Sequence, residues 1–230
     1  MFLDAGGVLV FPNWTRVSDA LARHGVAVPA ATLADADPRA KKRLDRGETI
    51  QGTNDQQRGW TYFNLVLDEA GVELSDDTVA ALSELHEYHQ TSNLWEDVPG
   101  GVRPALAALR ARGHRLVVVS NANGRLRHLF ERVGLIDAVD ALFDSCDEGV
   151  EKPDPRFFNI ALERSGSAAA TTVHVGDLYH VDVVGARAAG IQPVLLDIAD
   201  LYRECDCPRV RSLDGLIELL ARGAEALGGA

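Results

Sequence analysis

The sequence predicts an α/β fold in which a doubly wound, mainly parallel sheet is interrupted by an inserted all-helical unit. Three observations support this prediction. The chain opens with a short apolar run that ends on a carboxylate, at residues 1–4. Residues 14–95 have the pattern of successive helices without strand character, and after Gly101 helices alternate with short apolar runs. Strands that alternate with helices of this size are typical of βαβ units and therefore of a parallel sheet.

The first element is the apolar run 1–3, which stops on Asp4 and turns through Gly6 and Gly7. This pattern predicts a buried strand that delivers Asp4 to the edge of the sheet. Open parallel sheets bind ligands in the crevice beyond the carboxyl ends of their strands, so Asp4 is a candidate site residue. An aspartate before glycines is also ordinary turn chemistry, and Asp4 by itself leaves that structural interpretation open.

The helical unit is predicted to span residues 14–97, which leaves 1–13 and 98–230 as the α/β core. Apolar residues recur at helical spacing in three stretches of the unit: Val17, Leu21 and His24; Tyr62, Val66 and Leu67; and Val79, Leu82, Leu85 and His86. Pro12-Asn13 on one side and residues 97–101 on the other are rich in turn formers. They are expected to serve as paired linkers, or hinges.

Beyond the second linker, helices and strands are expected to alternate. Strands are predicted at 115–119, 141–143, 172–175 and 193–196, and the last of these is expected to be the final strand. Helices are predicted around 102–109, 126–133, 157–162, 184–188 and 213–220.

Composition excludes several classes of function. A formal net charge of −11 argues against a protein that binds nucleic acid or an anionic membrane, while a local patch still allows a small anionic substrate. Three cysteines are too few for a disulfide framework, and Cys205-Asp206-Cys207 is interpreted as a surface loop in preference to a metal site. No apolar stretch approaches membrane-spanning length and no basic start precedes an apolar run, so a cytoplasmic protein is expected.

Polar side chains follow three of the predicted strands at the point where each strand ends. They are Asp4, then Ser120 with Asn121, then Asp177, with Asp182 shortly after it. In a doubly wound sheet these strand ends meet at one crevice. Several ionised carboxylates share a pocket only when a cation offsets them, and an oxygen-rich site of this kind suits Mg²⁺.

Lys152 adds a positive charge to this set. It lies between Glu151 and Pro153-Asp154-Pro155, where the prolines favour a rigid loop before a helix. A lysine and a hydroxyl can hold phosphoryl oxygens, and a carboxylate in line can attack phosphorus to form an aspartyl phosphate. Each residue alone has a structural interpretation, such as a helix cap or a solvated charge. Their joint placement at strand ends favours a phosphate site.

The four stretches, in this order, resemble the motifs of the haloacid dehalogenase (HAD) superfamily of hydrolases with a helical cap. The matching segments are Asp4-Ala5-Gly6-Gly7-Val8-Leu9, Ser120-Asn121, Lys152-Pro153-Asp154-Pro155, and Gly176-Asp177 with Asp182. The resemblance implies a Rossmann-like core, a cap formed by the insertion, and a phosphatase acting on a small phosphorylated metabolite. It implies Asp4 as the nucleophile and a phosphate site formed by Ser120, Asn121 and Lys152. It also implies a Mg²⁺ site formed by Asp4, the carbonyl of Gly6, Asp177 and Asp182.

Gly6 departs from the family's pattern. Most HAD phosphatases have a second aspartate at this position, which serves as general acid and base. The glycine keeps the carbonyl for the metal but has no side chain to protonate the leaving oxygen, a contribution worth about 10²- to 10⁴-fold. Two alternatives therefore stay open. One is a 2-haloacid dehalogenase, which needs neither Mg²⁺ nor this acid, and the other is a catalytically weak or silent member that binds a ligand or partner. The retained Asp177 favours the phosphatase.

Substrate choice is expected to lie in the helical unit. Two groups are candidates: the basic run Lys41, Lys42, Arg43 and Arg46 on a predicted helix, and the cluster Arg58, Trp60 and Tyr62. Solvated helix faces explain such basic runs more often than ligand sites do. Three histidines are candidates to replace the missing acid: His24, His86 and His89. The paired linkers further suggest that the cap opens and closes over the crevice.

Overall fold

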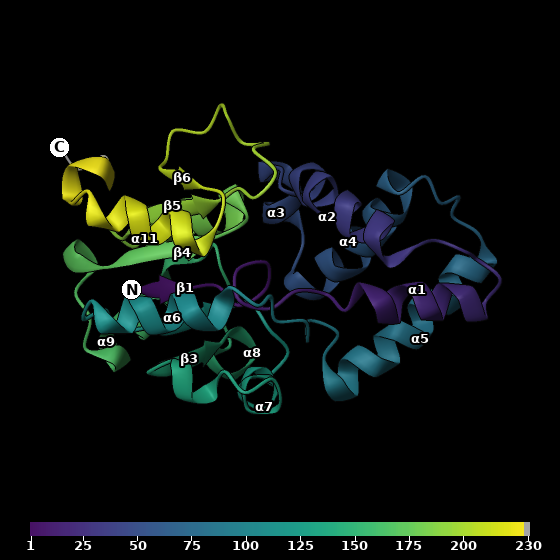
Figure 1. Cartoon of the computed structure of the whole chain (residues 1–230), viewed down its shortest axis with the longest axis horizontal. Helices are drawn as coiled ribbons and strands as arrows, with labels where there is room; N and C mark the ends of the chain where they lie inside the picture. Colours follow the sequence, from purple (N-terminus) through teal and green to yellow (C-terminus); the bar gives the residue numbers. More distant parts are fainter. Residues whose placement is uncertain (228–230) are drawn as a thin grey trace. The chain divides into compact units, whose positions relative to one another are not determined.

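The computed structural model describes residues 1–227 of the chain. The fold divides into two compact units, one formed by Met1–Phe11 with Val98–Ala230 and the other by Pro12–Asp97. Each unit has an apolar core of its own. The two are therefore described separately (Figure 1).

Within the described residues, the first unit contains one sheet of six strands in the order β3-β2-β1-β4-β5-β6, and every neighbouring pair is parallel. The strands are β1 (Phe2–Leu3), β2 (Val117–Ser120), β3 (Ala141–Asp144), β4 (Val173–Gly176), β5 (Gln192–Leu196) and β6 (Arg209–Val210). The direction of winding reverses between β1 and β4. This is the Rossmann-like arrangement that the sequence predicts, and ligands of such sheets bind beyond the strand ends at the reversal.

Helices lie between these strands and after the last of them. They are α6 (Val102–Ala111), α7 (Leu126–Arg132), α8 (Ser145–Glu148), α9 (Pro155–Ser165), α10 (Val184–Ala188) and α11 (Leu213–Ala221), with 3₁₀ turns at Ile136–Ala138, Ala169–Thr171 and Ala224–Leu227. One turn of π-helix, η3 (Tyr179–Val183), precedes α10. Helices α6 and α11 pack together and lie in front of the sheet in Figure 1. Val117, Val118 and Val119 are all fully buried, and because successive side chains point to opposite faces, both faces of the sheet are covered.

The second unit contains only helices among its described residues. They are α1 (Trp14–Arg23), α2 (Ala30–Leu44), α3 (Gly47–Gly52), α4 (Asp55–Glu69) and α5 (Asp76–Ser92). Their apolar stripes meet in one core that includes Leu21, Leu33, Leu67 and Leu85. Asn54 and Ser75 form capping boxes that satisfy the first amides of α4 and α5, which fixes where these helices begin.

Two expectations about individual elements are wrong. Val79 is 60% exposed, because the buried stripe of α5 runs through Thr78, Ala81, Leu82 and Leu85 and leaves Val79 beside it. The strand at 193–196 is not the final one, since β6 pairs with it through Leu196 and Val210. A strand of two residues is too short to produce a recognisable period in the sequence.

The segment Cys205–Cys207 is only partly a surface loop. Cys207 is buried in a small cluster with Val183, Leu195 and Tyr202. Burial raises the pKa of the Cys207 thiol to about 11, so at neutral pH this side chain is a protonated apolar group. Separately, the described part of the chain holds no helix with the length and apolarity needed to cross a membrane.

Candidate active site

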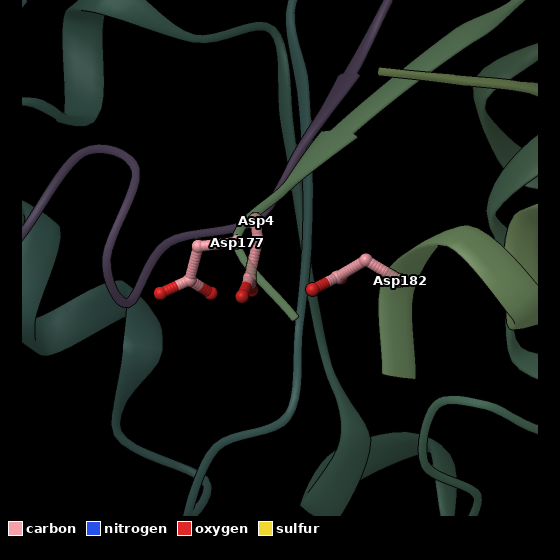
Figure 2. A group of neighbouring side chains, drawn as sticks. All are labelled: Asp4, Asp177 and Asp182. Atoms are coloured by element: carbon pink, nitrogen blue, oxygen red, sulfur yellow. The ribbon is translucent and has the colours of Figure 1, made fainter. Parts of the chain in front are cut away.

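Three aspartates meet at the carboxyl ends of β1 and β4 (Figure 2). Asp4 directly follows β1, Asp177 directly follows β4, and Asp182 lies on η3. One carboxylate oxygen from each lies within 4.8 Å of the others. Figure 2 shows the carboxyl groups of Asp4 and Asp177 side by side, with that of Asp182 directed toward them from another segment. The reversal point of the sheet thus brings Asp4, at the start of the chain, together with Asp177 and Asp182, which lie more than 170 residues later.

Lys152 is the buried cation of this cluster, with no exposed surface. Its Nζ lies 2.9 Å from Asp4 Oδ1 and 2.7 Å from Asp182 Oδ1. Burial acts to lower the pKa of Lys152, but the carboxylates of Asp182 and Asp4 outweigh it and raise that pKa above its ordinary value. The lysine is therefore charged at neutral pH, and it links the aspartate at the end of β1 to the aspartate on η3.

Asn121 holds the backbone of Lys152. Its Nδ2 donates to the Lys152 carbonyl over 3.0 Å, and its Oδ1 accepts from the Lys152 N–H over 2.8 Å. Pro153 follows through a cis peptide bond. The amide of Asn121 therefore fixes the loop that carries the lysine, whereas the phosphate-binding role assigned to Asn121 from the sequence stays a prediction.

Ser120 is the last residue of β2, the strand beside β1, and it is 4% exposed. Its hydroxyl donates to the Asn121 carbonyl over 3.4 Å, a long contact of little strength. The register pairs Leu3 with Val118, so Ser120 and Asp4 both lie at the same carboxyl edge of neighbouring strands. The hydroxyl can turn from its weak contact toward an anion bound at that edge.

Asp182 is held by three donors. Its Oδ1 accepts from Lys152 Nζ and lies 2.9 Å from His174 Nε2, while its Oδ2 accepts from the Leu178 N–H over 3.1 Å. Burial acts to raise the pKa of Asp182, but Lys152 and His174 outweigh it and hold that pKa below its ordinary range. Gly176 makes room for this carboxylate, because a Cβ at that position would lie 2.0 Å from Asp182 Cγ.

The loop after β1 is closed by its own backbone. The amides of Val8, Leu9 and Val10 donate to the carbonyl of Ala5, and Gly7 adopts a φ of 77°, which favours glycine. Gly6 lies inside this loop and contributes no side chain. Its carbonyl is the group that the sequence analysis assigns to the metal.

The charges of the cluster fit a divalent cation. Asp4, Asp177 and Asp182 are three carboxylates within 4.8 Å, and Lys152 offsets one of them. The remaining negative charge needs a cation, since close ionised carboxylates disfavour one another. Oxygen ligands of this type are those that Mg²⁺ prefers. Both carboxylate oxygens of Asp182 accept from protein donors, whereas Ala5 N–H and Lys152 both contact Asp4 at Oδ1, so Asp4 is the better ligand of these two.

Two of the predicted basic groups, Arg43 and Arg58, have partners inside the helical unit. Helix α2 ends at Leu44 and Arg46 caps α3, so the predicted basic run does not lie on one helix. Arg43 pairs with Asp68 and Glu69. Arg58 is 4% exposed and donates to the Thr53 carbonyl over 2.6 Å. These contacts stabilise the packing of the helices.

The three histidines proposed as replacement acids also have partners inside the helical unit. His24 lies 3.2 Å from Glu84, and His86 stacks on Trp60. His89 accepts the Leu94 N–H at Nδ1, and burial, aided by the charge of His86, lowers the pKa of His89 to about 4. His89 is therefore unprotonated at neutral pH and is a poor proton donor.

Sequence reasoning missed His174 and the role of Gly176. The sequence pattern places His174 only within a predicted buried strand. The available signal was a polar ring at a position flanked by valines, since a buried polar group requires a partner.

The comparisons with known proteins agree with this geometry. The family model for haloacid dehalogenase-like hydrolases matches residues 1–190. The haloacid dehalogenase-like hydrolase domain-containing protein 3 of Bos taurus is 32% identical over 180 residues, which cover 75% of this chain and 70% of that protein. A ribulose-1,5-bisphosphate 5-phosphatase of Halopiger xanaduensis is 34% identical over 96 residues, 41% of this chain and 40% of that enzyme.

Solved structures show the same fold. The putative HAD-hydrolase YfnB of Bacillus subtilis aligns with a TM-score of 0.67 at 19% identity and covers 95% of this chain and 96% of its own. A 2-haloacid dehalogenase of Pseudomonas syringae aligns with a TM-score of 0.60 at 24% identity and covers 96% of this chain and 97% of its own. Likeness at these identities extends to the fold and does not distinguish the two chemistries.

Proposed function

Since the chain belongs to the haloacid dehalogenase-like hydrolase family, we propose that it is a Mg²⁺-dependent phosphohydrolase that acts on a small phosphate monoester through an aspartyl phosphate. The observation that carries the proposal is the Asp4 carboxylate held by buried Lys152 beside Asp177. A metal-free dehalogenase has no use for Asp177, so its presence in the cluster favours the phosphatase. The relative named as a ribulose bisphosphate phosphatase supports the same choice.

In the proposed reaction Asp4 is the nucleophile. A carboxylate oxygen of Asp4 forms a bond to phosphorus, and the bond from phosphorus to the ester oxygen breaks with its electron pair on the leaving oxygen. Lys152 and the Ser120 hydroxyl hold the phosphoryl oxygens during this transfer. A water molecule then attacks phosphorus, which releases inorganic phosphate and a proton and restores the Asp4 carboxylate.

Asp4, Asp177 and the Gly6 carbonyl would hold the cation. When bound, Mg²⁺ supplies positive charge that lowers the repulsion between the aspartates and an incoming phosphate dianion. The chain's own residues orient the reactants: Lys152 fixes Asp4, and Asn121 fixes the loop of Lys152.

The first test is hydrolysis of an aryl phosphate by the wild-type chain and by Asp4→Asn, with and without Mg²⁺. Asp214→Asn, at an exposed position of α11, is the matched control. We expect Asp4→Asn to lower turnover at least about 10⁴-fold, chelation to abolish it, and the control to retain it. Turnover that survives in Asp4→Asn would contradict the mechanism. Metal-independent release of halide from a 2-haloacid would favour the dehalogenase.

Cation binding is tested separately from turnover by thermal unfolding. Because Mg²⁺ binds the folded cluster, saturating Mg²⁺ should stabilise the wild-type chain, by about 2.7 kcal/mol at a hundredfold excess over Kd. Asp177→Asn removes a ligand and should lose most of this increase, whereas Asp214→Asn should keep it. Equal increases in all three proteins would place the cation elsewhere.

Gly6 predicts a strong dependence on the leaving group. With no side chain to donate a proton, turnover should fall steeply from aryl phosphates to alkyl phosphates. Gly6→Asp should raise the rate on alkyl phosphates by about tenfold or more, since general acid catalysis is worth about 10²- to 10⁴-fold. An unchanged ratio between the two substrate classes in Gly6→Asp would show that another group already supplies the proton.

A further inference from the structure

His174 is a buried polar side chain that takes no direct part in the proposed reaction. It lies in β4 with no exposed surface, and its ring meets the edge of Phe158 with the ring centroids 4.8 Å apart. Its Nε2 lies 2.9 Å from Asp182 Oδ1. An imidazole in an apolar strand costs free energy compared with a valine or leucine, so this contact calls for an explanation.

The contact identifies which ring nitrogen carries the proton. An ionised carboxylate only accepts hydrogen bonds, so Nε2 donates to Asp182. Nδ1 is buried and makes no hydrogen bond within residues 1–227, and a proton there would leave a buried N–H unsatisfied. The ring is therefore neutral, with its proton on Nε2.

The hydrogen bond leads to the nucleophile in two further steps. The same oxygen of Asp182 that faces His174 also accepts from Lys152 Nζ at 2.7 Å, and that Nζ lies 2.9 Å from Asp4 Oδ1. Asp182 is confined on its other side by Gly176. Removal of the His174 donor would leave Asp182 Oδ1 with Lys152 alone. The carboxylate would then be less restrained, and so would the lysine that it orients.

From this geometry we infer that His174 is a positioning residue, whose Nε2–H fixes Asp182 so that Lys152 holds Asp4 in the orientation for attack. The inference rests on the proposed function. His174 acts through Asp182 and Lys152, and its effect on the reaction is one of alignment.

Three substitutions at His174 distinguish the effect of losing the hydrogen-bond donor from the effect of losing the volume of the ring. His174→Gln retains an amide donor at the reach of Nε2, His174→Asn places its amide where Nδ1 lies, and His174→Leu has no donor. Phe158→Leu is the control, because it loosens the packing against the same ring and leaves the donor in place. We expect kcat on an aryl phosphate to fall about tenfold in His174→Leu and His174→Asn, with KM changed less than about threefold. His174→Gln and Phe158→Leu should stay within about threefold of wild type.

A second measurement reports on the lysine without turnover. The chain has only three lysines, Lys41, Lys42 and Lys152, so the ammonium signals in a ¹⁵N-lysine NMR spectrum are few. In Mg²⁺-free buffer, the ammonium protons of Lys152 should exchange with water at least about fivefold faster in His174→Leu than in wild type or His174→Gln. Lys41 and Lys42, in the helical unit, serve as internal references.

The two measurements distinguish the failure of the inference from the failure of the proposed function. Absence of phosphatase turnover in wild type would overturn the function, and the exchange of Lys152 would still decide the role of His174. Turnover in wild type with equal kcat in His174→Leu and Phe158→Leu would reduce His174 to a packing residue. If His174→Leu does not fold, equal kcat and equal exchange in His174→Gln and His174→Asn overturn the inference.

Discussion

The two units of the molecule use buried polar groups differently. In the α/β unit, the fully buried His174, Asp182 and Lys152 form a continuous chain of contacts that ends at Asp4. In the helical unit, buried polar side chains form hydrogen bonds within the unit. Tyr62 donates to Asp37 over 2.7 Å, and Arg58 donates to the Thr53 carbonyl. Buried Asp197, in the α/β unit, also has only local partners, Arg209 and two backbone amides, so burial of a charge alone does not identify a functional residue.

The difference arises from topology. Parallel strands bring together the ends of segments that are distant in sequence, so Asp4, Lys152 and Asp182 meet although they come from three separate parts of the chain. Arg58, by contrast, contacts the Thr53 carbonyl and Asp55, both within five residues along the chain, at the end of α3 and the start of α4.

The largest effect is expected from removing one buried cation in each unit. Lys152→Met leaves the carboxylates of Asp182 and Asp4 without their cation, which should lower the free energy of unfolding by about 3–5 kcal/mol and reduce turnover at least about 10³-fold. Arg58→Met loses hydrogen bonds to backbone carbonyls and should cost about 1.5–3 kcal/mol with turnover within about threefold. Urea unfolding and aryl phosphate hydrolysis measure both.

Asp55, an ion-pair partner of Arg58, has a side chain that is 46% exposed, so after Arg58→Met water can still solvate its carboxylate. This is why the two substitutions are expected to differ. If Arg58→Met reduced turnover as severely as Lys152→Met, the assignment of Arg58 to the stability of the helices would be incorrect.

The second effect compares two glycines. Gly176→Ala would place a Cβ 2.0 Å from Asp182 Cγ, so the carboxylate must move, and we expect a loss of about 1–3 kcal/mol and at least about tenfold in kcat. Gly59 lies inside α4 with open space at its Cβ position. Gly59→Ala should therefore stabilise the chain by about 0.5–1 kcal/mol with unchanged turnover. A fully active Gly176→Ala would show that the position of Asp182 does not matter for the reaction.

The same contrast explains what the sequence could predict. Asp4, Ser120, Asp177 and the order of the core elements are local signals, because each polar residue directly follows an apolar run. The contact of His174 with Asp182 depends on how η3 packs beside β4, and no spacing rule encodes it. The engagement of Asn121 with the backbone of Lys152 depends on packing in the same way. In the helical unit the periodicity located the helices but misplaced Val79, since a pattern of apolar residues does not state which edge of the stripe is buried.

The smallest effect concerns pH and the helical unit. Burial, aided by the charge of His86, lowers the pKa of His89 to about 4, against about 6.5 in the unfolded chain. Between these values the unfolded chain binds more protons, so the free energy of unfolding falls as the pH drops through this window. Protonation also removes the Nδ1 acceptor that holds the Leu94 N–H.

His89→Asn keeps an acceptor near the position of Nδ1 and removes the titrating group. The loss of stability between pH 6.5 and pH 4.5 should therefore be smaller in His89→Asn than in wild type, by about 1–2 kcal/mol in urea unfolding. The exposed His128, in α7 of the other unit, provides the control His128→Asn, which should leave the slope unchanged. An equal slope in wild type and His89→Asn would show that His89 does not contribute to the acid sensitivity of the chain.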